Sequence, residues 1–160
     1  MPIVESTIEI QADATELFDL SQDYALRTTW DPFVREMRFL HGAQVPEVGT
    51  QVWVKAHNRL TMEVEFVVMN RPHTVAMKMT RGPFFFERFA GTWKFKSTAQ
   101  GTTVVTFRYN FRVKGLRLLM DPIITLLFKR DVRLRLEGLK RAVEQSDILK
   151  RLPSSPLCPC

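Results

Sequence analysis

The sequence predicts an α+β domain in which a seven-stranded antiparallel sheet receives one long C-terminal helix. Residues 34–113 contain six segments of alternating apolar and polar residues, separated by short gaps rich in turn-forming residues. Residues 116–145 are dominated by good helix formers, with apolar side chains at spacings of three and four. Because short gaps join antiparallel neighbours, the six segments form a meander whose apolar face the helix can cover.

Before the meander, the chain predicts one strand and two short helices. Residues 2–10 alternate between polar and apolar positions, which indicates a strand with one buried face. An acidic cap at Asp13 precedes a short amphipathic helix. Asp23 begins a second short helix that ends before Pro32, because the residue before a proline avoids helical geometry. The first strand completes the sheet as its seventh strand.

The meander follows, with each strand presenting one apolar and one polar face by its alternation. Its six strands are predicted at residues 34–41, 49–57, 60–69, 74–80, 84–96 and 102–113.

The terminal helix is predicted to begin at Asp121, because a carboxylate followed by Pro122 is a helix start signal. About 24 helical residues would span about 36 Å. The buried stripe consists of Ile124, Phe128, Val132, Leu136, Leu139 and Val143. Residues 116–127 are apolar on nearly every side, so we expect them to be enclosed.

Length and composition favour one globular domain followed by a flexible tail at residues 148–160, which is rich in proline and serine and holds Cys158 and Cys160. The sequence shows no secretory signal and no apolar run long enough for a membrane span, so we expect a cytoplasmic protein. The net charge is +6: residues 112–160 hold 11 basic and 5 acidic side chains, and residues 1–111 hold 12 of each. This excess indicates either a solvated helix face or attraction to an anionic surface.

The element order and several local motifs resemble the START-like (Bet v 1-like, SRPBCC) superfamily, of the polyketide cyclase/dehydrase and lipid transport type. The motifs are Ile8-Glu-Ile10, Ala12-Asp-Ala-Thr-Glu-Leu-Phe18, Asp23, Trp30-Asp-Pro32, Gly49, Gly91-Thr-Trp93 and Leu139-Lys-Arg-Ala-Val-Glu144. The resemblance implies a START-like ligand-binding domain over residues 1–147. It also implies a helix-grip fold, in which a curved sheet wraps around the terminal helix and leaves a cavity for an apolar or amphipathic ligand.

Strand parity and this resemblance together predict a soft, apolar cavity wall rich in methionine and aromatic side chains. An ordinary filled core is the alternative. The predicted ligand-binding residues are Trp30, Met37, Phe39, Val54, Met62, Val64, Phe66, Met77, Met79, Phe85, Phe89, Phe107, Tyr109, Ile124 and Phe128.

Two residues are candidates for catalysis. If the alternation in residues 84–96 is unbroken, Glu87 faces the cavity, where desolvation raises a carboxyl pKa and suits a general acid or base. A bulge that turns Glu87 outward beside Arg88 is the alternative. Tyr109 is the candidate proton donor. Arg135 follows Asp131 by four residues, which favours a surface ion pair over a clamp for a ligand carboxylate.

Three functions are compatible with these residues. The first is binding or carriage of a small hydrophobic ligand such as a lipid, isoprenoid or polyketide. The second is a polyketide cyclase/dehydratase acting in the same cavity, and the third is a basic-helix module that docks on an anionic membrane or protein. We expect no cofactor and no metal, because the histidines are dispersed and no nucleotide motif is present. We expect no nucleic-acid partner, and a monomer or homodimer.

Overall fold

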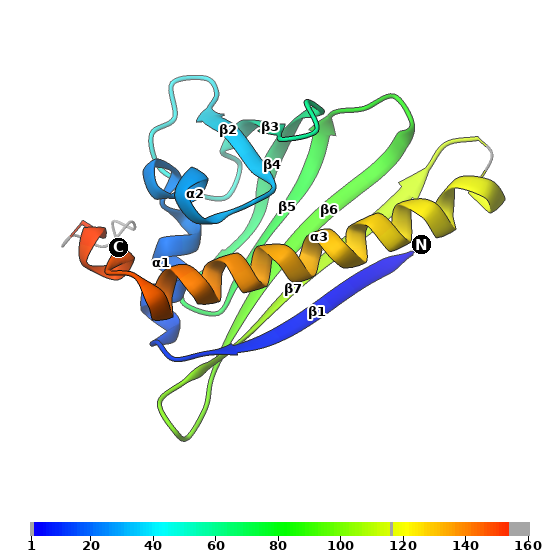
Figure 1. The fold of residues 1–160 in the computed structure, drawn as a ribbon. Coiled ribbons are helices and arrows are strands. Elements are labelled where there is room, and N and C mark those ends of the chain that lie inside the picture. The colour runs from blue at the N-terminus through cyan, green and yellow to red at the C-terminus, as the bar shows by residue number, and fades with distance from the viewer. Residues whose placement is uncertain (1, 116, 154–160) are drawn as a thin grey trace.

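The computed structural model describes residues 2–115 and 117–153, and it confirms the predicted order of elements (Figure 1). The N-terminal elements are β1 (Ile3–Ile10), α1 (Ala14–Gln22) and α2 (Tyr24–Trp30). The remaining strands are β2 (Val34–Phe39), β3 (Gln51–Ala56), β4 (Thr61–Asn70), β5 (Thr74–Arg81), β6 (Phe86–Ser97) and β7 (Thr103–Val113). Helix α3 (Arg117–Gln145) and a 3-10 turn, η1 (Ile148–Arg151), follow.

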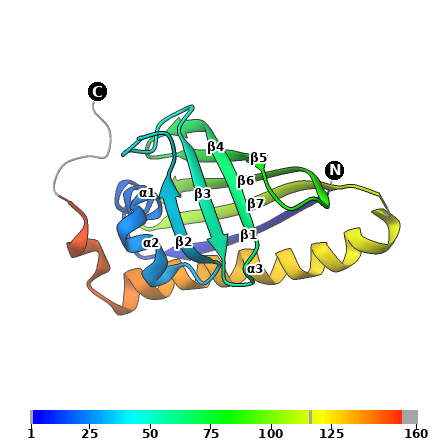
Figure 2. The ribbon, with the colours of Figure 1, turned by 90° about the horizontal axis from the view of Figure 1, so that it is seen from above.

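The strands form one 7-stranded antiparallel sheet in the order β1-β7-β6-β5-β4-β3-β2. The meander gives sequential neighbours, and β1 returns to pair with β7 at the opposite edge from β2. Figure 2 shows the sheet as a curved layer on one side of α3. Helices α1 and α2 close one end of this curve, and the N-terminal half of α3 lies toward the other end (Figure 1).

The core lies between the concave face of the sheet and α3, as the alternation predicts. On β7 every second residue from Thr103 to Val113 is buried, while the residues between them are half-buried. Trp93 on β6 stacks on Phe107 of β7 with ring centres 4.2 Å apart. Helix α3 contributes the predicted stripe, and its members Ile124, Val132, Leu136, Leu139 and Val143 are buried.

The predicted start of the terminal helix is wrong, because Pro122 lies inside α3 rather than at its first position. Leucine and methionine are strong helix formers, and residues 117–120 extend the helix ahead of the proline. The prediction that residues 116–127 are enclosed is also wrong for the part that the structure describes. Leu119 is 67% exposed and Leu126 is 70% exposed, because only the face that carries Ile124 packs against the sheet.

The chain continues to pack beyond the predicted domain boundary at residue 147. Ile148, in η1, is buried in the main hydrophobic core. The part of the predicted flexible tail that holds Cys158 and Cys160 lies outside the described residues.

Gly138 sits where α3 crosses the end of α2. A Cβ at this position would lie 2.5 Å from the Trp30 carbonyl oxygen and 3.1 Å from Cδ of Pro32. The close approach of the two backbones therefore requires glycine, although alanine is the better helix former by about 1 kcal/mol.

We expect Gly138→Ala to lower the free energy of unfolding by about 1–3 kcal/mol, because α3 must shift away from α2. Urea denaturation followed by circular dichroism measures this change. Arg141→Ala, at an exposed position of the same helix, is the control and should change stability by less than about 0.5 kcal/mol. A stabilised Gly138→Ala protein would contradict this account of the contact.

Candidate functional site

An apolar cavity of about 310 Å³ opens between the N-terminal half of α3 and the β3–β4 and β5–β6 connections. This volume lies at the small end of ligand pockets, which range over about 300–1,000 Å³. We call it the outer cavity. It is lined by Phe33, Asn58, Leu60, Met62, Pro83, Phe85, Phe86, Phe89, Ile124, Leu127, Phe128, Arg130, Asp131 and Leu134.

A smaller space of about 50 Å³ lies deeper in the fold and shares Phe33, Met62 and Phe89 with the outer cavity. We call it the inner cavity. Its volume matches one or two water molecules at about 30 Å³ each, or one small polar group of a ligand. Apolar side chains of β2 to β7 form most of its wall, but Arg27, Tyr109 and Arg135 also line it. The two cavities therefore share part of their apolar wall, and the inner one adds charged and hydroxyl groups.

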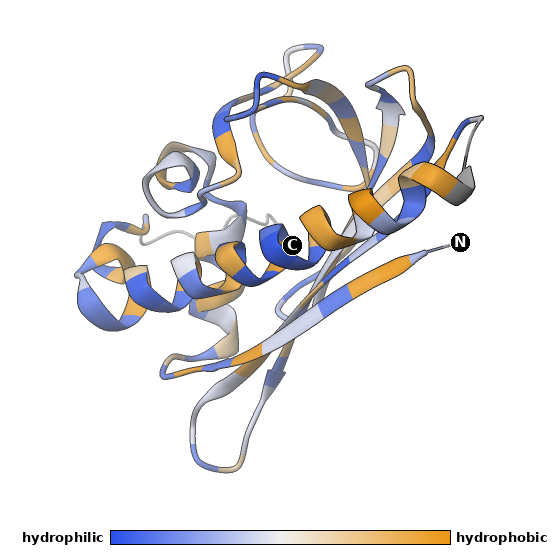
Figure 3. Ribbon diagram, turned by 45° about the vertical axis from the view of Figure 1, so that its right-hand side comes forward, coloured by the Kyte–Doolittle hydropathy of each residue, from blue (hydrophilic) through white to orange (hydrophobic). Residues whose placement is uncertain are grey.

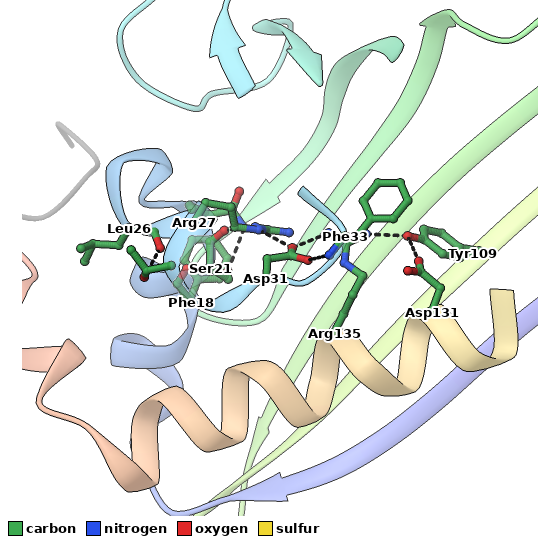
Figure 4. A network of polar contacts seen from close by, with 11 residues as sticks. Phe18, Ser21, Leu26, Arg27, Asp31, Phe33, Tyr109, Asp131 and Arg135 are labelled. Carbon is green, nitrogen blue, oxygen red and sulfur yellow. Dashed lines mark hydrogen bonds and ion pairs between the residues drawn. The ribbon is translucent and has the colours of Figure 1, made fainter. Parts of the chain in front are cut away.

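The carboxylate of Asp31 holds two buried guanidinium groups together beside the inner cavity (Figure 4). Its Oδ2 accepts hydrogen bonds from Arg27 Nε at 2.7 Å and from Arg135 Nη2 at 2.8 Å. Its Oδ1 accepts from the backbone N–H of Phe33 at 3.0 Å. Burial alone would raise the pKa of Asp31, but Arg135 and Arg27 hold it below its ordinary value. Asp31 is therefore ionised at neutral pH.

Tyr109 extends this network to Asp131 (Figure 4), a residue that lines the outer cavity. Its hydroxyl accepts a hydrogen bond from Arg135 Nη1 at 2.5 Å and donates one to Asp131 Oδ2 at 2.8 Å. Burial raises the pKa of Tyr109 well above its ordinary value, so the phenol stays protonated. Burial also raises the pKa of Asp131, and the opposing charge of Arg135 only partly offsets this effect.

The guanidinium of Arg135 is packed between aromatic rings. Its central carbon lies 4.5 Å from the ring centre of Phe107 and 4.8 Å from that of Phe33. Such cation–π contacts favour the charged form and fix the plane of the group. Arg135 Nε is buried and has no hydrogen-bond partner among the described residues, which leaves one donor unused in a residue that lines the inner cavity.

The structure brings most of the predicted ligand-binding residues to the two cavities. The outer cavity is lined by Met62, Phe85, Phe89, Ile124 and Phe128. The inner cavity is lined by Met37, Val54, Met62, Val64, Met77, Phe89, Phe107 and Tyr109. Four predicted residues line neither cavity: Trp30, Phe39, Phe66 and Met79.

These four residues pack inside the fold. Phe39 stacks on Tyr24 with ring centres 4.8 Å apart, and the same tyrosine lies 6.5 Å from Phe66. Trp30 meets Trp93 edge to face at 6.1 Å. Met79 is partly buried against the main core. Facing inward therefore does not suffice to line a cavity, and for Trp30, Phe39 and Phe66 the reason is that α2 packs into the closed end of the sheet.

The prediction that Glu87 faces the cavity is wrong. Phe86 pairs with Val113 while Arg88 pairs with Arg112, so the register shifts between them and Glu87 is the extra residue of a bulge. Its side chain is exposed and forms an ion pair with Arg112 at 3.5 Å. This is the outward alternative that the sequence left open, and Glu87 has no place in a site inside the cavity.

The predicted surface pairing of Arg135 with Asp131 is also wrong. Arg135 is 5% exposed and bonds to Asp31 and Tyr109, while Asp131 is reached through the Tyr109 hydroxyl. Sequence reasoning missed the roles of Phe33, Asp31 and Asp131. The structure buries the carboxylate of Asp31 completely. The Trp30-Asp-Pro32 motif contains this residue and was the signal in the sequence that could have identified it.

Two further properties bear on the site. Within residues 2–115 and 117–153, no three His, Cys, Asp or Glu side chains gather as a metal site would require. None of the described helices has the length and apolar character needed to cross a membrane.

Comparison with solved structures identifies the same fold in distant proteins. A START superfamily protein from Mycobacterium smegmatis superposes with a TM-score of 0.74 at 15% identity, over 89% of this chain and 97% of that one. Zhui aromatase/cyclase from Streptomyces sp. R1128 gives 0.68 at 15%, over 89% and 96%. Norcoclaurine synthase from Thalictrum, a point mutant in complex with a transition-state analogue, gives 0.69 at 13%, over 90% and 94%.

At these identities the structural matches show the fold alone, and a comparison with curated proteins finds no match to the sequence. The sequence itself carries the assignment, since residues 1–144 match the family model for polyketide cyclase/dehydrase and lipid transport. The resemblance predicted from the motifs is confirmed. With its seven-stranded curved sheet closed over α3, a fold shared with the START superfamily protein, this chain belongs to the polyketide cyclase/dehydrase and lipid transport family.

Proposed function

We propose that this protein binds a small hydrophobic ligand that carries one polar end, and that it acts as a carrier. The observation that supports this most directly is the apolar outer cavity, whose wall includes Asp131 of the Arg135–Tyr109–Asp131 network and which shares lining residues with the inner cavity. Apolar pockets with a few convergent polar groups are the usual form of small-molecule sites.

The apolar body of the ligand would supply most of the affinity. Phe85, Phe89, Ile124 and Phe128 offer aromatic and aliphatic surface, and Met62 adds an adaptable thioether. Burying about 200 Å² of apolar ligand surface contributes about 5 kcal/mol before the entropic cost of association is subtracted. A lipid, isoprenoid or polyketide-like molecule fits these walls.

The polar end of the ligand would set its orientation. Tyr109 and Arg135 present hydrogen-bonding groups at the inner cavity, and Asp131 lies at the junction with the outer cavity. A hydroxyl, enol or carbonyl group suits this arrangement, because hydroxyls both donate and accept while Arg135 Nε remains an unused donor. Burying such a group without partners would be costly, so the network selects for ligands that carry one.

A polyketide cyclase/dehydratase is the second candidate, and Asp131 is the observation that favours it. Its carboxyl lines the outer cavity, is bonded by Tyr109, and has a raised pKa because of burial. A carboxyl of this kind can accept a proton from a carbon between two carbonyls and later return it to a leaving hydroxyl. In this candidate Asp131 takes the role that the sequence assigned to Glu87, and Tyr109 positions it.

We expect Tyr109→Phe to lower affinity for 1-naphthol by about fivefold to tenfold, because one hydrogen bond contributes about 0.5–1.5 kcal/mol. Affinity for naphthalene, which lacks the hydroxyl, should stay within about twofold. Calorimetric titration of both probes measures the difference. Tyr24→Phe removes a buried hydroxyl from a residue that lines neither cavity and serves as the control. Failure of the wild-type protein to bind either probe would contradict the carrier proposal.

For the enzymatic candidate, we expect Asp131→Asn to reduce turnover of a linear poly-β-ketone by about 100-fold or more, because general acid–base groups contribute that much. Binding of 1-naphthol should stay within about threefold. Glu87→Gln is the control and should turn over normally, since Glu87 is exposed on the outer face. If the wild-type protein leaves the poly-β-ketone unchanged, the enzymatic candidate is wrong and the carrier proposal stands.

The raised pKa of Asp131 also predicts how stability depends on pH. The folded protein holds this proton to a higher pH than the unfolded chain, whose carboxyl has a pKa of about 3.9. The contribution of Asp131 is therefore complete below that value and is lost as pH rises through the raised pKa. Urea denaturation at a series of pH values should show wild-type stability falling relative to Asp131→Asn over this range. A difference that grows with pH would show that the bonds to the carboxylate outweigh its burial.

A further inference from the structure

The N-terminal half of α3 exposes a continuous apolar stripe. Leu119, Ile123, Leu126 and Leu127 are between 58% and 70% exposed. At 100° per residue these positions lie within about one third of the helix circumference. Figure 3 shows hydrophobic colouring along this half of the helix. Single exposed apolar residues are ordinary on protein surfaces, but a continuous stripe of this kind indicates an interaction surface.

The stripe borders the mouth of the outer cavity. Leu127 lines that cavity, as does Leu134, which is 37% exposed. Across the mouth, the β5–β6 connection presents Phe84, which is 86% exposed, beside the cavity residue Phe85 at a ring distance of 5.6 Å. The apolar surface thus surrounds an opening into the apolar interior.

Cations surround this apolar surface. Arg130 follows the stripe on α3 and lines the outer cavity. Arg59 and Arg81 line a shallow depression together with Phe84, and the backbone N–H of Lys114 bonds to the Phe85 carbonyl at 2.8 Å. All four side chains are exposed, and none forms an ion pair within the described part of the chain.

The C-terminal half of α3 differs in this respect. Lys140 donates to the Glu9 carbonyl at 2.7 Å and pairs with Glu144 at 3.3 Å, and Arg133 pairs with Glu137 at 3.7 Å. The basic face expected from the sequence is therefore partly neutralised within the fold. The uncompensated charge near the cavity mouth accompanies the apolar stripe instead.

We propose that this surface docks on the anionic face of a lipid bilayer, with α3 lying along the interface and the cavity mouth turned toward the acyl chains. Apolar side chains on one stripe, bordered by long cationic side chains, match the two layers of such an interface. The unpaired arginines and lysine complement lipid phosphates electrostatically. Docking would bring a membrane-dissolved ligand directly to the opening.

Vesicle flotation of the full chain tests this proposal. We expect binding to phosphatidylcholine vesicles that contain about 30% phosphatidylglycerol, weak binding to phosphatidylcholine alone, and loss of binding between about 0.05 and 0.5 M NaCl. The double variant Ile123→Ser/Leu126→Ser should bind about tenfold less or weaker, since it removes two large apolar side chains from the contact. Arg81→Glu/Arg130→Glu should bind less and should lose the salt dependence.

Matched controls use residues away from this surface. Val48→Ser changes an apolar residue that is 63% exposed on the β2–β3 connection, and Arg35→Glu changes an exposed cation on β2. Both should float like the wild-type protein. Titration with 1-naphthol should be unaffected by the Ile123→Ser/Leu126→Ser changes, so failure of docking and failure of ligand binding are separate results.

Three outcomes would overturn the proposal. The first is no flotation with anionic vesicles at low salt, and the second is equal loss of flotation in the control variants. The third is a wild-type dimer that Ile123→Ser/Leu126→Ser converts to a monomer without any vesicle binding, which would make the stripe an interface between two copies of the chain. Analytical ultracentrifugation distinguishes this third case.

Discussion

The fold depends on one buried carboxylate, Asp31, which is shared by two buried guanidinium groups. Arg27 comes from α2 and Arg135 from α3, so this carboxylate joins the helix pair at the closed end of the sheet to the long helix that crosses it. A buried charge without its partner is strongly destabilising, whereas a complete network fixes a single arrangement of the elements that carry it. The close passage of Gly138 under the Trp30 carbonyl occurs at the same junction, because the two helices can form these bonds only at short range.

The same network determines the chemistry of the interior. The alternation of the strands supplies an apolar wall, which by itself would suit any hydrophobic filling. Arg135 and Tyr109 change this, since the cation is packed on Phe107 and Phe33 and donates a hydrogen bond to Tyr109, whose hydroxyl in turn donates to Asp131 (Figure 4). The side chains that join the helices are therefore the same ones that we propose to orient the ligand, and the raised pKa of Asp131 follows from its placement beside them.

The sequence predicted the architecture because both periods, two for strands and 3.6 for the helix, are set by backbone geometry and burial. Prediction from the sequence failed where one extra residue shifted the alternation of a strand. It also failed where tertiary contacts buried a side chain that its local sequence places at the surface. A single bulge at Glu87 turned that carboxylate outside, whereas an unbroken alternation with Phe85 and Phe89 would have faced it inward. The local sequence predicts that Arg135 lies at the surface beside Asp131. Its burial depends instead on Asp31, which lies 104 residues earlier in the chain. No local pattern encodes such a pairing.

The wrong prediction that residues 116–127 are enclosed also affects the functional interpretation. An apolar stretch on every side of a helix is expected to be enclosed, yet only the face that carries Ile124 and Phe128 meets the sheet. The exposed leucines are therefore not surplus core residues, because no neighbouring element in the described chain covers them. They stand beside a cavity whose lining has the same apolar character. An apolar exterior beside an apolar cavity, bordered by unpaired cations, suits the proposed transfer of a ligand between a membrane and the protein, since the ligand would then avoid water.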